Sequence, residues 1–331
     1  MTELPSPETI RERALEAVER GSGAASDRAD HGGRSEPVNL LVGPLDGTDP
    51  LADLEVATDA ETGESVYRGP RAARAGLLAV AATVAGSEEA DGESSAAADT
   101  NARLHFPDAN LTAAGPWLVL EPLDGRLSTV VRGRARVSVD LERAPEASAT
   151  YQRLEIDEDR LSAVLEAAKP SHPHYPVEDD RDGVFTTGMT TFSLAGVEAG
   201  DDRLTTGGEA SSERLTVVLE AATTPTTVYA EVESRFESCP GVEAVRLERV
   251  AGVDRARPSR ATRTAVEGAH RAVLGDCTYD WLPPGSILEA VPTPEKVALG
   301  TGEPGEPFDA DAFATGTRLL EEALARMEGS P

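Results

Sequence analysis

Carboxylate and imidazole side chains stand at the ends of several short apolar runs in this sequence. Asp46 follows the first of these runs. His105 and Asp108 lie at the end of the second, and Glu121 directly follows the third. Nitrogen and oxygen ligands of this kind can hold zinc, and a bound metal ion can activate water for hydrolysis. His105, Asp108 and Glu121 could therefore form a single-metal hydrolytic site.

The apolar runs have the pattern of buried strands that stop at loops. Residues 40–42, 102–106 and 117–120 are short and largely apolar, and turns containing Pro follow them. An Ala-rich apolar stretch at 74–84 predicts a helix directly after the turn-rich segment 43–69. In an open α/β sheet, ligands bind beyond the carboxyl ends of the strands, which is where these polar residues would lie.

Three motifs resemble those of one enzyme family. Residues 43–46 read Gly-Pro-Leu-Asp, residues 67–76 read Tyr-Arg-Gly-Pro-Arg-Ala-Ala-Arg-Ala-Gly, and residues 121–125 read Glu-Pro-Leu-Asp-Gly. Their order resembles that of the co-catalytic metallohydrolases that include zinc-dependent aminoacylases, acetylornithine deacetylases, succinyl-diaminopimelate desuccinylases and carboxypeptidase G. The resemblance covers nearly the whole chain. It implies a relative of metal-dependent enzymes that hydrolyse amide bonds.

Several of the metal-binding positions implied by this resemblance carry residues that cannot bind a metal. The metal-binding histidine of the family aligns with Pro44, and the aspartate that would bridge two metal ions aligns with Ala72. Asp46 is present, but the family's aspartate at this place only orients the missing histidine. Glu121 matches a carboxylate ligand of the family and is the best-preserved position.

Further positions also depart from the family pattern. The glutamate pair that supplies the general base and a ligand should follow the strand 102–106, where Asp108 stands in a Pro-Asp-Ala-Asn turn. The histidine that reaches into a partner's site aligns with Glu146, and the arginine for the substrate carboxylate falls near Glu220. No histidine follows His270, so the last ligand is absent. The resemblance thus implies no bound metal, with zinc or cobalt expected only in a remodelled site.

Other candidate groups are better explained by structure than by chemistry. Glu88-Glu89 is a glutamate pair, but it lies in an acidic, low-complexity segment that precedes the strand. His172 and His174 stand in a Pro-rich stretch without a Cys or carboxylate pattern beside them. Cys239 and Cys277 have no histidine at a recognisable spacing and are expected to be free thiols.

The expected fold class is α/β, with a three-layer metallopeptidase-like domain and an inserted α+β ferredoxin-like domain. Residues 1–125 and 251–331 would form the first domain, and residues 126–250 the second. The inserted segment reads strand, helix, strand, strand, helix, strand, which is the ferredoxin-like order. The resemblance implies that it acts as a lid and dimerisation domain. Helices are expected at 7–20, 74–85, 157–168, 226–238, 258–274 and 311–327, with inserted-domain strands including 184–197, 213–222 and 242–250.

The 331-residue chain is strongly acidic. It carries 59 Asp and Glu against 31 Lys and Arg, a formal net charge of −28, and lysine is nearly absent. This charge disfavours nucleic acid and anionic membranes as partners. No apolar run approaches the ~20 residues that a membrane span needs, and the N-terminal residues lack the apolar core of a signal peptide. We therefore expect a cytoplasmic protein, with an amino-acid composition typical of proteins from a high-salt cytoplasm.

Lowering the salt concentration is expected to destabilise this protein. The excess carboxylates repel one another when unscreened, because the Debye length grows from ~3 Å at 1 M salt to ~30 Å at 0.01 M. Thermal melts across a salt series measure the effect, and the melting temperature should fall steadily as salt is removed. Melts that coincide from molar to low-millimolar salt would contradict the expectation.

Three functions remain open from the sequence. The first is a metal-free homologue of these amidohydrolases that acts as a non-catalytic binding protein or as the partner of an active relative, in a homodimer or a heterodimer. The second is an active hydrolase of N-acyl amino acids or small peptides with a displaced metal site. The third is a small-molecule binding protein that uses the cleft for a ligand with an amide and a carboxylate. The missing ligands favour the first, because metal binding needs a full set of deprotonated donors.

Overall fold

The computed structural model describes residues 4–27, 37–43, 49, 51–52, 54–59, 63–86, 102–107, 111, 113–141, 158–169, 190–200, 214–224 and 227–329. The chain divides into two compact units, the first formed by Met1–Val131 with Arg255–Pro331 and the second by Arg132–Asp254. The second unit begins later than the 126 expected from the sequence. The reason is that Ser128 still pairs with Ala298 in the sheet of the first unit.

A five-stranded sheet forms the centre of the first unit. Its order is β4-β1-β5-β13-β6, and all strands are parallel except β6, which runs antiparallel to β13. Parallel strands are buried on both faces, which explains why the strands in the middle of this sheet are continuous apolar runs. The strands are β1 (Val38–Leu41), β4 (Ala102–His105), β5 (Trp117–Leu120), β6 (Leu127–Ser128) and β13 (Lys296–Leu299).

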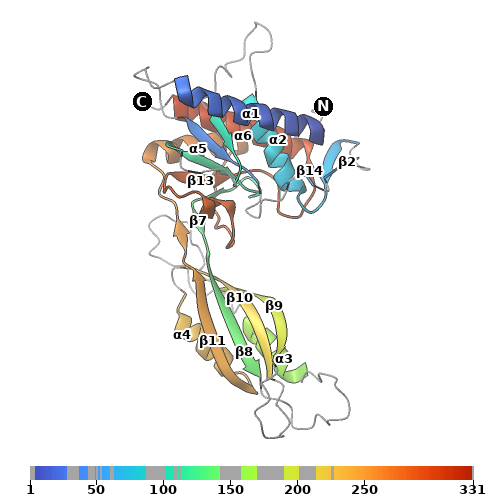
Figure 1. The fold of residues 1–331 in the computed structure, drawn as a ribbon, viewed down its shortest axis with the longest axis vertical. Coiled ribbons are helices and arrows are strands. Elements are labelled where there is room, and N and C mark those ends of the chain that lie inside the picture. Colours follow the sequence, from blue (N-terminus) through green and yellow to red (C-terminus); the bar gives the residue numbers. More distant parts are fainter. Residues whose placement is uncertain are drawn as a thin grey trace. The chain divides into compact units, whose positions relative to one another are not determined.

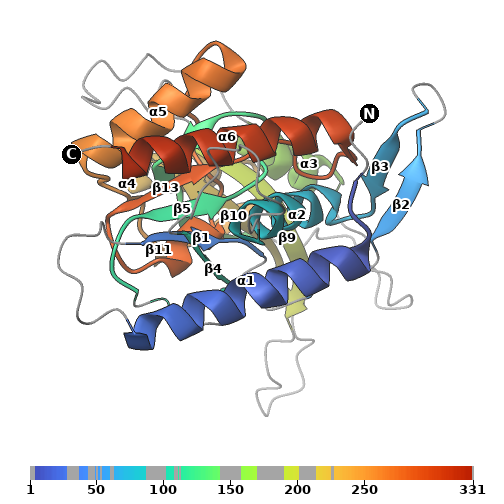
Figure 2. The same ribbon diagram turned by 90° about the horizontal axis from the view of Figure 1, so that it is seen from above.

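Four helices pack together in one hydrophobic cluster with side chains of the sheet, including Leu40, Leu118 and Leu299. Figure 2 shows three of them, α1, α2 and α6, running across the sheet. Ser259 and Asp309 cap α5 and α6, since each side chain accepts a hydrogen bond from a backbone N–H of the first turn. The four helices are α1 (Pro7–Asp27), α2 (Ala72–Gly86), α5 (Arg260–Leu274) and α6 (Ala310–Glu328).

A second hydrophobic cluster includes Leu41, Trp117 and Val119, strand residues that alternate with those facing the helices. Their partners come from the segment before β13, which contains the 3₁₀ helix η1 (Ile287–Ala290). The first unit therefore has three layers, with helices, sheet and the η1 segment. This confirms the expected fold class.

Three short antiparallel strands pair with one another, and the first two of them lie in the segment 43–69, which the sequence predicts to be turns only. They are β2 (Glu55–Thr58), β3 (Ser65–Arg68) and β14 (Phe308–Asp309), in the order β14-β3-β2. The prediction missed β2 and β3 because β2 is largely exposed and has no apolar face. Tyr67 is fully buried and lies opposite Phe308, so this small sheet is anchored to the core at the start of α2.

The second unit is a four-stranded antiparallel sheet with two helices, which Figure 1 also shows. Its chain order is β8-α3-β9-β10-α4-β11 and its spatial order is β11-β8-β10-β9, which is the ferredoxin-like arrangement that the sequence predicts. Val137, Val139 and Leu219 pack against Val164 of α3 and Phe236 of α4. The elements are β8 (Gly133–Leu141), α3 (Glu158–Ala168), β9 (Thr191–Gly200), β10 (Arg214–Thr223), α4 (Tyr229–Glu237) and β11 (Val242–Ala251).

One local expectation is corrected by the structure. The first helix continues to Asp27, although Gly21 and Gly23 favour a loop after residue 20. The short strands β7 (Val130–Val131) and β12 (Asp254–Arg255) pair with each other in a separate two-stranded sheet. None of the described helices is both long and apolar enough to cross a bilayer.

Candidate functional site

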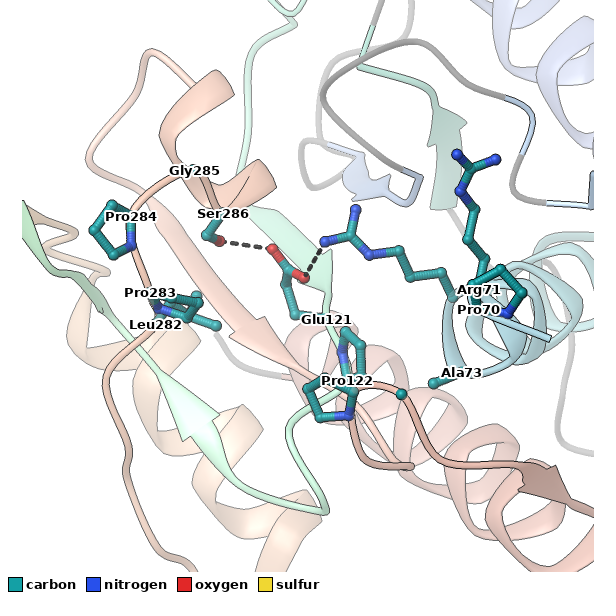
Figure 3. Close-up of a pocket in the computed structure, with 13 residues that line it drawn as sticks. Pro70, Arg71, Ala73, Glu121, Pro122, Leu282, Pro283, Pro284, Gly285 and Ser286 are labelled. Carbon is teal, nitrogen blue, oxygen red and sulfur yellow. Dashed lines mark hydrogen bonds and ion pairs between the residues drawn. The ribbon is translucent and has the colours of Figure 1, made fainter. Parts of the chain in front are cut away.

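A pocket of about 460 Å³ lies in the first unit, next to the carboxyl end of β5 (Figure 3). Because parallel strands present their carboxyl ends at one edge of the sheet, this is where a ligand site is expected in such a fold. Four segments far apart in the sequence meet here: the start of α2, the turn after β5, the loop before η1 and the turn after β13. The lining residues are Pro70, Arg71, Ala73, Arg74, Glu121, Pro122, Leu282, Pro283, Pro284, Gly285, Ser286, Pro304 and Gly305.

Glu121 is the central polar residue of the pocket and is only 4% exposed. Its Oε1 accepts hydrogen bonds from Ser286 Oγ at 2.6 Å and from the backbone N–H of Ile287 at 2.8 Å. Hydrogen bonds to an ionised acceptor are about twice as strong as those between neutral groups. These two bonds therefore fix the carboxylate at the N-terminus of η1.

Arg74 supplies a positive charge opposite this carboxylate. Its Nη2 lies 3.8 Å from Glu121 Oε2, and the arginine side chain is 32% exposed (Figure 3). Arg74 is the third residue of α2, so the start of this helix determines where its guanidinium can reach. Arg71 is oriented differently, since its Nη1 donates to the carbonyl oxygen of Asp49 at 3.3 Å.

A buried lysine supports the loop that holds Glu121. Lys296 is 3% exposed, and its Nζ donates to the carbonyl oxygens of Leu288 and Val291, each at 2.9 Å. Ser286 Oγ also accepts from the backbone N–H of Leu288 at 3.1 Å and so caps η1. These bonds satisfy backbone groups at both ends of the short helix, which keeps Ser286 in place for Glu121.

The structure places Ala72 away from this polar centre. Ala72 begins α2 and is 2% exposed, and its side chain belongs to the hydrophobic cluster between the helices and the sheet. The position that the resemblance assigns to a metal-bridging aspartate thus contributes to the core instead.

His105 is engaged on another part of the sheet. Its Nε2 lies 3.0 Å from Oδ1 of the buried Asn39, whose own amide nitrogen donates to backbone carbonyl groups. Nε2 must therefore donate the hydrogen bond. Burial, together with the nearby charge of Arg103, lowers the pKa of His105, which favours the neutral ring. The ring also contacts that of Trp117, with centroids 4.9 Å apart.

The remaining predicted positions are less informative. Glu220 lies on β10, exposed and opposite Arg136 of β8. Several candidate residues fall outside the described residues: Pro44, Asp46, Asp108, Glu146, Glu88, Glu89, His172 and His174.

The described residues around Glu121 do not fit a dinuclear metal site. Glu121 Oε1 already accepts two hydrogen bonds, and the charge of Arg74 faces Oε2, where a metal ion would meet like charge. Within the described part of the chain, no three His, Cys, Asp or Glu side chains gather where they could hold an ion. The described side chains can hold a charged group electrostatically, and no set of ligands for activating water forms among them.

Sequence reasoning identified Glu121 but missed the groups that surround it. Ser286 is separated from Glu121 by 165 positions, and no motif marks it beyond a serine at the N-cap of a short helix. Arg74 lies within the segment 67–76 that carries one of the three motifs, but no role was predicted for it from the sequence.

Three solved structures with a similar fold are peptidases. A tripeptidase from Staphylococcus aureus aligns with a TM-score of 0.55 at 13% identity, covering 99% of this chain and 95% of that one. The aminopeptidase PepT from Bacillus cereus aligns with a TM-score of 0.53 at 11% identity, covering 98% and 94%. Human carnosine dipeptidase 1 aligns with a TM-score of 0.51 at 13% identity, covering 89% and 80%.

At these identities the likeness concerns the fold. The chain therefore has the two-unit architecture of these peptidases, with a three-layer α/β unit interrupted by a ferredoxin-like unit. No protein-family model and no curated protein matches the sequence.

Proposed function

We propose that this chain is a non-catalytic relative of metal-dependent amidohydrolases that binds its ligand without a metal ion. The observation that carries the proposal is the ion pair between Arg74 and the buried Glu121. Glu121 is the best-preserved metal-ligand position, and an arginine supplies the positive charge beside it. A fixed cation can attract an anionic group, but it cannot lower the pKa of a bound water molecule as zinc does.

An activity panel tests this proposal. The purified protein is incubated with N-acyl amino acids and with di- and tripeptides, in molar salt, with and without added zinc, cobalt or manganese. We expect no hydrolysis above that of a sample of denatured protein under any of these conditions. Metal-stimulated turnover that disappears with chelator would instead support an active hydrolase with a remodelled site.

We further propose that the chain assembles through its ferredoxin-like unit, with a second copy or with an active relative. Among the described strands of this unit, β9 and β11 lie at the two edges of the sheet, and the outer backbone groups of β9 can pair with another chain. Leu194 and Val197 on this strand are 52% and 39% exposed. Exposed apolar residues on an edge strand are usually covered in an assembly, because they otherwise favour aggregation.

Replacing Leu194 by lysine is expected to shift the full-length protein from dimer to monomer. A charge on an edge strand disfavours strand pairing. Sedimentation velocity in molar salt measures the change. Val56→Lys is the matched control, because Val56 is 44% exposed on β2 of the other unit and should leave the assembly intact. A wild-type protein that sediments as a monomer at micromolar concentration would refute the proposed assembly.

A further inference from the structure

The guanidinium of Arg74 has hydrogen-bonding capacity beyond its contact with Glu121. The separation of 3.8 Å is longer than a hydrogen bond, so the two groups attract each other as charges only. A guanidinium carries five N–H donors in a planar fork that matches a carboxylate. Since the arginine side chain is 32% exposed and lines the pocket, some of these donors can reach a ligand there.

The charge of the lining also favours an anion. Among the described residues that line the pocket, the charged ones are Arg71, Arg74 and Glu121, and their two positive charges and one negative charge leave a net charge of +1. This excess stands out in a chain with a net charge of −28. The N-terminus of α2 begins at the pocket and adds a partial positive charge. Arg71 contributes less, because it points away from Glu121 and donates to Asp49 (Figure 3).

The remaining walls of the pocket are mainly apolar and stiff. Proline has no backbone N–H, so these positions offer no donors for further anionic oxygens. A ligand with a single negative charge can pair with Arg74, and an apolar body can contact these walls. A dianion would carry more negative charge than the net positive charge of the described lining. The apolar wall residues are Pro70, Pro122, Leu282, Pro283, Pro284 and Pro304.

We propose that the pocket binds a small organic carboxylate, with Arg74 as its charged contact. The arginine bridges the ligand carboxylate and Glu121, while Glu121 keeps its bonds from Ser286 and Ile287. This carboxylate site specifies the kind of ligand for the metal-free function proposed above, and it rests on that function. A neutral analogue of the ligand gains the apolar contacts but loses the interaction with Arg74, so it binds more weakly.

Calorimetric titration with matched probes tests this site. Acetate, butyrate, benzoate and phenylacetate are compared with their four neutral amides, at constant salt and in the presence of chelator. We expect at least one carboxylate to bind about tenfold more tightly than its amide, which is the order of effect that a hydrogen-bonded charge produces. Four carboxylates that bind no better than their amides would overturn the proposal.

Two variants locate the binding. Arg74→Gln should weaken carboxylate binding about tenfold or more, and Arg74→Lys should weaken it less, because lysine keeps the charge but not the fork. Arg68→Gln is the matched control, since Arg68 also forms an ion pair at 3.8 Å, with Asp59, and does not line the pocket. Thermal melts confirm that the variants are folded.

The outcomes separate the two proposals. Binding that persists in chelator and is unchanged in Arg74→Gln would overturn the carboxylate site while leaving the metal-free function standing. Binding that chelator abolishes in the wild-type protein would overturn the metal-free function itself.

Discussion

Replacing Gly300 by alanine is expected to lower the free energy of unfolding by about 3 kcal/mol, because overpacking at a rigid site is among the costly core substitutions. Gly300 follows β13, where the chain passes close to the turn after β5. A Cβ atom at this position would lie 2.1 Å from the carbonyl oxygen of Glu121 and 3.1 Å from Leu77 Cδ2. The nearest atom belongs to the backbone, so relief of the clash requires the two strand ends to move apart.

Chemical denaturation at fixed salt measures this loss. Gly329→Ala is the control in the same unit, because its Cβ would meet only Ala325 O at 3.4 Å, an ordinary contact. Gly300→Ala should also weaken carboxylate binding, since the displaced backbone carries Glu121. A Gly300→Ala protein as stable as the wild type would show that the strand ends are not packed as described.

Replacing Glu121 by alanine is expected to cost about 2–4 kcal/mol of folding free energy, as for the loss of a buried, hydrogen-bonded charge. The substitution leaves the hydroxyl of Ser286 and the N–H of Ile287 without their acceptor, in a buried position. It also removes the charge that faces Arg74. The partial exposure of Arg74 keeps the expected cost below that of a fully buried ion pair.

Glu121→Gln is the informative companion variant. The amide oxygen can still accept from Ser286 and Ile287, so this variant should lose about half as much stability as Glu121→Ala. Denaturation curves of the three proteins at the same salt concentration test the order. Equal stability of wild type and Glu121→Ala would contradict a structural role for this carboxylate. A stability difference that vanishes in chelator would indicate a metal ligand instead.

The ferredoxin-like unit could be predicted from the sequence because its pattern is local. Strands such as β8 alternate buried and exposed residues along one chain segment, and the element order then selects the topology. The strands β1 and β5 were also found, since continuous apolar runs indicate strands buried on both faces. Local patterns failed for β2, whose residues are exposed or half-buried and provide no apolar face.

The candidate site was only partly predictable, because its residues come from distant parts of the sequence. Glu121 was found because it stands in a recognisable turn after an apolar strand. Its partners Arg74 and Ser286 lie on a helix and on a distant loop, and only tertiary packing brings them to the same carboxylate. Ala72 is a further example. The resemblance assigns this position to a metal ligand, whereas the structure shows a buried residue of the helix cluster.

The metal content of the protein tests the central claim most directly. The full-length chain is purified in molar salt without chelator, incubated with excess zinc or cobalt, passed over a desalting column and analysed by elemental mass spectrometry. We expect far less than one ion per chain, and the same low value for Glu121→Ala, because Arg74 already provides the positive charge at Glu121. About one or two ions per chain in the wild type, lost in Glu121→Ala, would contradict the metal-free function.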